Sequence, residues 1–422
     1  MVPQPDNPEP AHHDIDSMLS RKFGKEVANY FSGSPLNRVG FLRADHQFLS
    51  QALKHPSTAF LLCNELQPLV QSGTAPGKGR LQYVKYEDVQ PVIGSDPFAQ
   101  SEKEMLDAYR SDQYIPQMIF LGLDEKVPEG EGLAYQAKNL YKGAPYFAVD
   151  VTPRPQADAR ISEACKTLIT RLQKEQGFEF GKGRIMDIEP SDAAIYAEAR
   201  QLLDWNQRNP FCAACGHKTF SVHAGFKRTC PPTDRAADAS AVERPACVTR
   251  HGVSNLCFPR TDPTVIMAVI NHAGDKILLG RQKRWPPYWY STLAGFAEPA
   301  ESIEEAVRRE VYEEAGVIVG RVIIHSTQPW PYPANLMIGA IGQAVAGDGE
   351  KIDLGNDPEL DDAKWFSFDE VRHSLRVGTS GLGEDAGPEY KEGDLRLPPS
   401  TAIANQLMTA VANGFASGDS KM

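Results

Sequence analysis

The sequence predicts an α/β protein built from two sizeable domains with a small cysteine-rich module between them. With 422 residues the chain is too long for one ordinary domain. Its 41% hydrophobic and 23% charged residues are typical of a folded globular protein. Five of its seven cysteines fall within residues 212–257, and helix and strand patterns occur on both sides of that cluster.

The N-terminal half begins with an arm and continues as a mixed α+β domain. Residues 1–29 are rich in Pro, His and Asp, so we expect a flexible arm. Residues 30–208 form the domain, with strands and helices expected over 117–121, 146–151, 157–176 and 192–208. A Gly-Ala-Pro turn at 143–145 is expected before the second strand. This half carries no catalytic constellation, which favours a scaffold or dimerisation domain.

The C-terminal half alternates strands and helices, which predicts a second α/β domain over residues 261–415. The first two strands flank an Asn-His-Ala-Gly turn at 271–274. The elements of this domain are expected over 264–270, 276–279, 302–315, 336–345, 365–366 and 400–413. The Gly-rich, acidic stretch 378–393 is expected as a surface loop, and residues 416–422 as a tail.

Charge and hydropathy exclude several classes of function. The net charge of −11 repels nucleic-acid backbone and anionic membranes, so broad duplex binding is not expected. No apolar run reaches the roughly 18–20 residues that cross a bilayer. The first sixteen residues lack the basic and apolar regions of a signal peptide. We therefore predict neither secretion nor membrane insertion.

The helix over 302–315 carries the strongest chemical signal. Ser302 and Glu305 form a capping box, and Gly316 follows where the helix stops. The apolar face of the helix continues one turn later as three carboxylates at i, i+3 and i+4, namely Glu310, Glu313 and Glu314. Because like charges repel and the C-terminal end of a helix disfavours anions, these carboxylates need compensation. A hard divalent cation such as Mg²⁺ or Mn²⁺ supplies it best, whereas an ordinary solvated acidic helix is the alternative.

The spacing around this helix, G-x5-E-x7-R-E-V-x-E-E-x-G-V, begins at Gly295 and resembles the Nudix box. The resemblance implies a Nudix fold, an α/β/α sandwich, and hydrolysis of a nucleoside diphosphate linked to another moiety. It further implies that Glu310 and Glu314 are principal metal ligands together with the carbonyl of Ala294. Glu313 would be a ligand or base, and Arg309 would orient the glutamates. Water would attack a phosphorus while the cation neutralises the pyrophosphate.

A proline-rich segment after the box is expected to form a stiff extended wall, because three alternating prolines exclude a helix and a central strand. Trp330 and Tyr332 offer flat faces for stacking a base or a nicotinamide, whereas a packing loop is the context-free alternative. The segment resembles the SQPWPFPxS signature of the NADH pyrophosphatase branch of Nudix hydrolases, with departures at Thr327, Tyr332 and Asn335. The implied substrate-binding residues are Gln328, Pro329, Trp330, Pro331, Tyr332, Pro333, Ala334 and Asn335.

The same branch implies four further positions. Glu359, six positions before Trp365, matches a distal metal ligand, with a loop acid as the alternative. Ala404 matches a small helical residue that lets a substrate ring approach. Phe296 and Phe258 match aromatic stacking positions, although Phe258 also fits a core residue.

The cysteine-rich module, residues 209–260, predicts a structural zinc ribbon. Cys212 and Cys215 form a CxxCG knuckle, and Cys230 follows. In the family the fourth ligand lies close to the third cysteine, but here an insertion separates them. Cys247 is the predicted fourth ligand and Cys257 its rival. Four protein ligands leave no open position, so the Zn²⁺ would be structural.

The chain ends in Ser420, Lys421 and Met422, which differ from the peroxisomal address Ser-Lys-Leu only at the last residue. The resemblance is to eukaryotic, especially fungal, members of the branch. We therefore expect recognition by the peroxisomal import receptor and a peroxisomal location, with a chance tail and a cytoplasmic location as the alternative.

Together these features predict a metal-dependent NADH pyrophosphatase that splits NADH, and less readily NAD⁺, into NMN and AMP. The resemblance implies a homodimer. An alternative enzyme would remove NAD caps from RNA 5′ ends with the same site, guided by the basic strip at 281–284. The alternative from another class is a non-catalytic nucleotide sensor, against which the intact carboxylate cluster argues.

Overall fold

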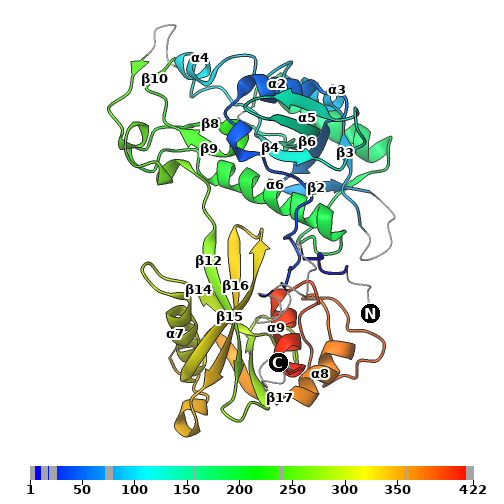
Figure 1. Cartoon of the computed structure of the whole chain (residues 1–422), viewed down its shortest axis with the longest axis vertical. Coiled ribbons are helices and arrows are strands. Elements are labelled where there is room, and N and C mark those ends of the chain that lie inside the picture. Colours follow the sequence, from blue (N-terminus) through cyan, green and yellow to red (C-terminus); the bar gives the residue numbers. More distant parts are fainter. Residues whose placement is uncertain are drawn as a thin grey trace.

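The computed structural model describes residues 5–10, 18, 26–71, 79–155, 157–236, 242–356 and 359–414. The chain forms two lobes (Figure 1). The N-terminal sheet and the cysteine-rich module make up one lobe, and the C-terminal sheet with its helices makes up the other. None of the helices in the described ranges is both long and apolar enough to span a bilayer.

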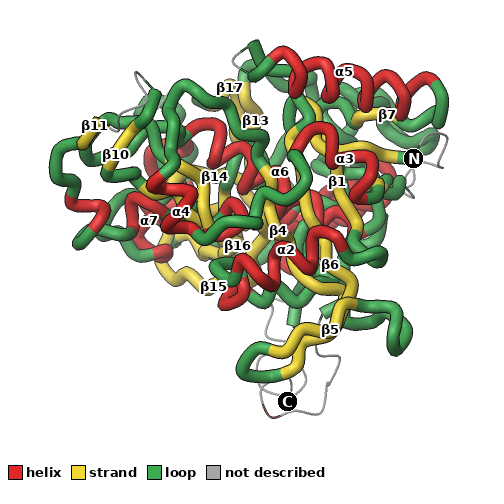
Figure 2. The backbone as a smooth tube through the Cα atoms, turned by 90° about the horizontal axis from the view of Figure 1, so that it is seen from above, coloured by secondary structure: helices red, strands yellow, loops and turns green. Residues whose placement is uncertain are grey.

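The N-terminal lobe is organised around a seven-stranded sheet with the order β4-β6-β1-β2-β7, in which β3 pairs with β1 and β5 with β6. The central strands β1 and β6 are parallel, and β5 projects from the body with the start of β6 (Figure 2). The strands are β1 (Ala59–Asn64), β2 (Gln67–Val70), β3 (Tyr83–Val84), β4 (Met118–Asp124), β5 (Leu133–Gln136), β6 (Leu140–Asp150) and β7 (Glu179–Phe180).

Helices cover both faces of this sheet, which explains why β1 is apolar at nearly every position. Phe60 and Leu62 pack with the helices of one face, and Leu61 and Cys63 pack with α6 on the other. The helices are α2 (His46–Lys54), α3 (Tyr86–Ile93), α4 (Glu102–Asp107), α5 (Ala159–Lys174) and α6 (Pro190–Arg208). The two predicted helices of this half are confirmed as α5 and α6.

The predicted turn at 143–145 is wrong, because β6 runs through it without interruption. Gly143 serves close packing instead. A Cβ at this position would lie 2.8 Å from the carbonyl oxygen of Asp124 on β4, so only glycine lets the two strands approach.

The cysteine-rich module packs beside α6 and consists of short strand pairs. Arg228 is buried and donates to the backbone and side chain of Asn206, which ties the module to α6. Its strands are β8 (Phe220–Val222), β9 (Lys227–Thr229), β10 (Thr233–Asp234) and β11 (Val242–Glu243). Residues 258–261 then lead into the second lobe.

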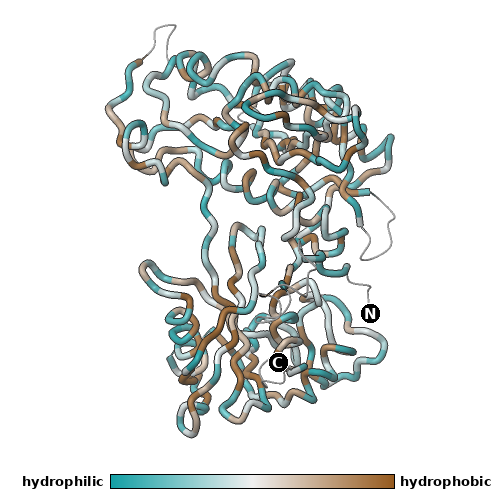
Figure 3. Tube along the Cα trace, viewed as in Figure 1, coloured by the Kyte–Doolittle hydropathy of each residue, from teal (hydrophilic) through white to brown (hydrophobic). Residues whose placement is uncertain are grey.

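The C-terminal lobe is an α/β/α sandwich around a six-stranded sheet with the order β15-β16-β12-β13-β17, where β14 pairs with β12. Helix α7 covers one face, and α8 and α9 cover the other. The most apolar part of the lobe is the set of strands between them (Figure 3). The elements are β12 (Asp262–Ile270), β13 (Lys276–Gln282), β14 (Leu293–Phe296), α7 (Ile303–Ala315), β15 (Val319–Trp330), β16 (Asn335–Ala344), β17 (Leu360–Ser367), α8 (Phe368–Val377) and α9 (Ile403–Ala412).

The proline-rich segment lies at the tip of the β15–β16 hairpin and joins the two lobes. Its first proline, Pro329, falls in β15, which is an edge strand, as a missing N–H donor requires. The Tyr332 hydroxyl accepts a hydrogen bond from Ile185 N at 2.7 Å, and Arg200 donates to Pro331 O at 2.8 Å. From the other side Asn29, only 1% exposed, donates to Thr327 O at 2.9 Å. The prediction of a flexible arm is therefore wrong for Asn29, because this residue is buried and hydrogen-bonded to the C-terminal lobe.

Candidate active site

Helix α7 forms where its sequence predicts it. Ser302 caps the N-terminus, where its hydroxyl accepts from Glu305 N at 3.2 Å and its own N–H donates to the Glu305 carboxylate at 2.8 Å. Gly316 ends the helix in the left-handed conformation, with φ of 70°. The predicted helix is confirmed, and with it the common face of the three carboxylates.

The carboxylates lie where the apolar face of α7 leaves the core. The preceding residues on this face, Ala306, Val307 and Val311, are fully buried. Glu314 remains buried at 5% exposure, whereas the side chains of Glu310 and Glu313 are 13% and 44% exposed. The stripe therefore presents one buried and two accessible carboxylates.

Arg309 connects these carboxylates to β14. Its Nη1 donates to Glu310 at 2.9 Å and to Glu313 at 3.0 Å, and its Nη2 donates to Phe296 O at 2.8 Å. The Glu301 carboxylate accepts hydrogen bonds from Arg309 Nε at 2.7 Å and from Arg309 Nη2 at 2.9 Å, and this pair of bonds fixes the plane of the guanidinium. These hydrogen bonds raise the pKa of Arg309, and the hydrogen bond to Glu301 has the largest effect. Arg309 therefore stays charged. Arg309 thus contacts two of the three carboxylates, and the positioning role that the resemblance implies for it stays a prediction.

The electrostatics around Glu310 favour a bound cation. Burial raises the pKa of Glu310; the hydrogen bond and charge of Arg309 oppose this, and the charges of Glu313 and Glu359 add to it. Glu359 is exposed beside the start of β17, and its charge reaches Glu310 from there. A largely buried carboxylate with two acidic neighbours is a place where a divalent cation relieves repulsion, and oxygen donors suit a hard cation.

The backbone of β14 completes this group of donors. Ala294, whose carbonyl is the predicted further ligand, pairs with Ile266 of β12. The next residue, Gly295, faces α7 so closely that a Cβ would overlap the carboxylate of Glu310. The absence of a side chain at 295 therefore makes the space that this carboxylate occupies. The donor set fits a divalent cation.

A cavity of about 880 Å³ lies between the two lobes, on the face of the C-terminal sheet opposite α7. Its lining from the C-terminal lobe includes Ile266 of β12, which pairs with Ala294 of the neighbouring strand β14. The N-terminal domain supplies Arg184, whose guanidinium lies 5.6 Å from the Trp330 ring. Its lining includes the aromatic residues Phe180, Trp285, Trp289 and Trp330 and, among several small residues, Ala404. Such a cavity suits flat rings with attached anionic groups.

Only part of the proline-rich segment faces this cavity. Gln328 lines it but is 1% exposed, and its amide is used by Tyr30 O, Thr401 O and Ile403 N. Asn335 donates to the Thr264 hydroxyl. Of the remaining members, Pro329 lines a second, separate cavity, and Pro331 and Tyr332 contact the N-terminal lobe. Pro333 follows a cis peptide bond, and Ala334 is buried. Their predicted contacts with substrate stay predictions, whereas Gln328, Pro331 and Tyr332 make hydrogen bonds to the N-terminal lobe.

The two predicted stacking phenylalanines lie in different places. Phe296 is exposed at the end of β14, next to the Arg309 network. Phe258 is exposed and lines the second cavity, beside the cysteine-rich module. The structure thus brings Phe296, and not Phe258, to the strand that carries the metal donors.

Sequence reasoning missed four residues of this site. Trp285 and Trp289 belong to a Trp-Pro-Pro-Tyr-Trp run whose alternation of rings and prolines resembles the segment after the box, and that signal could have identified them. Glu301, a fixed box position, was identifiable as an anion near Arg309. Arg184 lies in a loop of the N-terminal domain, and no local pattern indicates its place in the cavity.

The four predicted zinc ligands gather in the cysteine-rich module. The sulfurs of Cys212, Cys215, Cys230 and Cys247 all lie within 4.8 Å of one another. The Cys212–Cys247 and Cys215–Cys230 sulfur distances are 3.6 Å and 3.5 Å, close to the roughly 3.8 Å edge of a tetrahedron with Zn–S bonds of about 2.3 Å. Cys257 is outside this group. Among the described residues no other set of three or more His, Cys, Asp or Glu side chains gathers so tightly, so the carboxylates of α7 stand further apart than these thiols.

The fold and these two centres define a Nudix hydrolase with an attached zinc ribbon. Three families match along the chain, the NADH pyrophosphatase-like rudimentary NUDIX domain at 57–205, the NADH pyrophosphatase zinc ribbon domain at 207–236 and the NUDIX domain at 260–382. The chain belongs to the NADH pyrophosphatase branch of the Nudix family and is a hydrolase of the NAD(H) diphosphatase type. A divalent cation at α7 and zinc in the ribbon accord with that membership.

Relatives match nearly the whole chain. An NAD-capped RNA hydrolase of Schizosaccharomyces pombe is 32% identical over 93% of this chain and 96% of its own length. NAD-capped RNA hydrolase NPY1 of Saccharomyces cerevisiae is 34% identical over 92% of this chain and 96% of its own. NAD-capped RNA hydrolase NUDT12 of Homo sapiens is 35% identical over 91% of this chain and 73% of its own.

Gly295→Ala is expected to reduce activity without reducing stability. The added methyl forces the Glu310 carboxylate to move, and this carboxylate is the end of a flexible side chain. We expect kcat on NADH to fall by about tenfold or more while the thermal midpoint stays within about 2 °C. Gly320→Ala is the matched control, because its methyl makes only ordinary contacts, the nearest at 3.5 Å. Equal activity of the two variants would contradict the assigned position of Glu310.

Proposed function

We propose that this enzyme hydrolyses the pyrophosphate bond of NAD when NAD forms the 5′ cap of an RNA. The products would be NMN and RNA with a 5′-monophosphate. Two kinds of observation support this proposal. The three relatives named above are NAD-capped RNA hydrolases. The cavity lined by tryptophans and an arginine includes Ile266, whose partner in β14 is Ala294, the predicted carbonyl ligand of the cation.

The residues of the site divide the work. Trp330 and Trp285 offer flat faces for a base, and Ala404 leaves room for a ring. Glu310, Glu313, Glu314 and Glu359 with the Ala294 carbonyl would hold Mg²⁺ or Mn²⁺, which neutralises pyrophosphate charge and lowers the pKa of water. Arg309 holds two of these carboxylates in position. A water molecule oriented by Glu313 would attack one phosphorus in line with the leaving phosphate.

The basic strip at 281–284 gives the RNA a place to leave the cavity. Lys283 and Arg284 are exposed directly after β13, and Trp285, which follows them, lines the cavity. Arg281 is paired with Asp361, so it is already neutralised. Two exposed cations at this position offset, locally, the net charge of −11.

Salt dependence tests this proposal. We expect kcat/KM on NAD-capped RNA to fall steeply as salt rises, because phosphate contacts release counterions, while kcat/KM on free NADH changes little. For the double variant Lys283→Ala/Arg284→Ala, the plot of log kcat/KM on capped RNA against log salt concentration should be less steep by the contribution of about two phosphate contacts. Arg160→Ala on α5 is the control, because this exposed arginine pairs with Asp158 away from the cavity. Capped RNA left intact while NADH is cleaved would refute this function.

Free NADH is the second candidate substrate, favoured by the two NADH pyrophosphatase families that match residues 57–205 and 207–236. The same assay distinguishes the candidates through the ratio of the two kcat/KM values. The homodimer and the peroxisomal location also remain proposals. The C-terminal tripeptide Ser420-Lys421-Met422 lies outside the described residues.

A further inference from the structure

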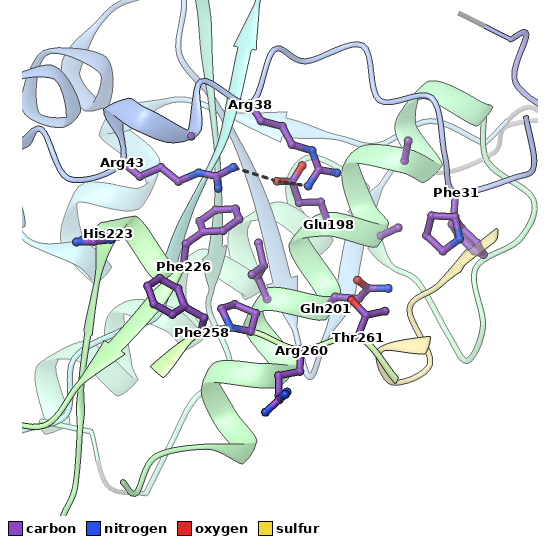
Figure 4. A pocket seen from close by; sticks show the side chains of 16 residues that line it. Phe31, Arg38, Arg43, Glu198, Gln201, His223, Phe226, Phe258, Arg260 and Thr261 are labelled. Carbon is purple, nitrogen blue, oxygen red and sulfur yellow. Dashed lines mark ion pairs between the residues drawn. The ribbon is translucent and has the colours of Figure 1, made fainter. Parts of the chain in front are cut away.

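A second cavity, of about 430 Å³, lies where the N-terminal domain, the zinc ribbon and the connecting segment 258–261 meet. Figure 4 shows its charged and aromatic lining, with Arg38 and Arg43 directed at Glu198 of α6. Phe226 of the ribbon lies under Arg43, whose guanidinium carbon is 3.2 Å from the ring centroid. None of these residues belongs to the carboxylate helix or to the cavity between the lobes.

The cavity contains buried polar groups that the described chain leaves unsatisfied. The Glu198 side chain is 98% buried, with Oε1 3.2 Å from Arg38 and 3.8 Å from Arg43, yet neither carboxylate oxygen has a hydrogen-bond partner. The same holds for Nε and Nη2 of Arg43 and for Nε2 of Gln201. A buried polar atom without a partner is unfavourable, so three such side chains around one cavity indicate a site built for a polar ligand.

The lining matches a phosphorylated nucleotide. Arg38 and Arg43 supply charged donors for a phosphate, and Gln201 adds a neutral donor. Phe226 offers a ring for stacking a base. Burial raises the pKa of Glu198 to about 7, although Arg38 and Arg43 oppose this, so near neutral pH its protonated form can donate to an anion and its ionised form can accept from a base amino group.

The position of this cavity relates it to the proposed RNA substrate. Pro329 lines it, and the next residue of β15, Trp330, lines the cavity between the lobes. Successive residues of a strand point to opposite sides. Phe31 separates the two spaces, because it lines the second cavity and its ring centroid lies 6.1 Å from that of Trp330.

We propose that this second cavity binds a nucleotide of the RNA chain that follows the NAD cap. The phosphate would bind at Arg38 and Arg43, with Gln201 and Glu198 completing the site. This inference rests on the proposed function as far as the RNA is concerned. A free mononucleotide has the same chemistry, so the experiment must separate the two sources.

Binding of a 5′-phosphorylated RNA trinucleotide without NAD tests the site independently of catalysis. The test variant is Arg38→Ala/Gln201→Leu, which removes one exposed cation and one unsatisfied buried donor while keeping the volume at 201. By isothermal titration calorimetry we expect its affinity to be at least about tenfold weaker than that of the wild type. Arg160→Ala should bind like the wild type, and the thermal midpoint of the double variant should not fall. Equal affinity of all three proteins would overturn the proposal.

Kinetics and a competing ligand complete the test. We expect the double variant to lose about tenfold in kcat/KM on NAD-capped RNA and to stay within about twofold on free NADH. An equal loss on both substrates would overturn the proposal in favour of a structural role. AMP that binds this variant-sensitive site as tightly as the trinucleotide would overturn the RNA assignment. Variant-sensitive trinucleotide binding by an enzyme that leaves capped RNA intact would support the nucleotide site and refute the proposed function.

Discussion

Glu314→Gln is expected to lower kcat on NADH by about a thousandfold, with the fold retained. Glu314 is the most buried carboxylate of α7 and belongs to the stripe that replaces the apolar face of the helix. Glutamine keeps its volume but removes the charge that holds a divalent cation. Products are resolved by chromatography and mass, and the midpoint of thermal unfolding checks the fold. The substitution removes a buried negative charge that lies beside the other glutamates. The midpoint of thermal unfolding of the variant should therefore be unchanged or higher.

Glu304→Gln is the control for this prediction. Glu304 lies in the first turn of the same helix and not on the carboxylate stripe. We expect this variant to keep kcat within about twofold of the wild type. A Glu314→Gln protein that hydrolyses NADH as fast as Glu304→Gln would remove the carboxylate helix from the reaction.

Cys247→Ser is expected to eliminate the zinc of the ribbon and to destabilise it. Its sulfur lies 3.6 Å from that of Cys212 in a group of four thiols, and a serine hydroxyl is a poor replacement for a thiolate. Zinc measured by atomic emission should fall from about one ion per chain to near zero. The thermal midpoint should fall by about 10 °C, because metal binding is coupled to folding of so small a module.

Cys257→Ser separates the two cysteines that the spacing leaves as rivals. Cys257 is buried but lies outside the group of four sulfurs. We expect this variant to keep its zinc and to lose only the packing of one small side chain. Zinc lost from Cys257→Ser and retained by Cys247→Ser would reverse the assignment.

Local sequence rules predict the parts of this enzyme that depend on local interactions. The capping box, the apolar face and the carboxylate stripe of α7 follow from residues within one helix, and the structure has each of them. The pattern of β12 likewise needs only a buried strand. The turn predicted at 143–145 fails for the opposite reason: the requirement for Gly143 arises from β4, about twenty residues away.

The cavity between the lobes shows what sequence patterns cannot predict. Its N-terminal wall, with Arg184, comes from a domain whose sequence carries no chemical motif. The contacts that place this wall join residues far apart in the chain, such as Tyr332 and Ile185. A motif identifies residue types at fixed spacing, whereas docking of two domains depends on surfaces that no single segment encodes. The proline-rich segment partly lines the cavity and partly connects the two lobes. For the same reason, this division could not be predicted from the sequence.

Product identity tests the central claim that the carboxylates of α7 direct water to a pyrophosphate bond. The enzyme is incubated with NADH, or with an NAD-capped RNA, and Mg²⁺ or Mn²⁺, beside Glu314→Gln. We predict reduced NMN and AMP from NADH, and NMN and 5′-monophosphorylated RNA from the capped RNA, with neither pair formed by the variant. Release of nicotinamide with ADP-ribose, or equal products from the variant, would contradict the account.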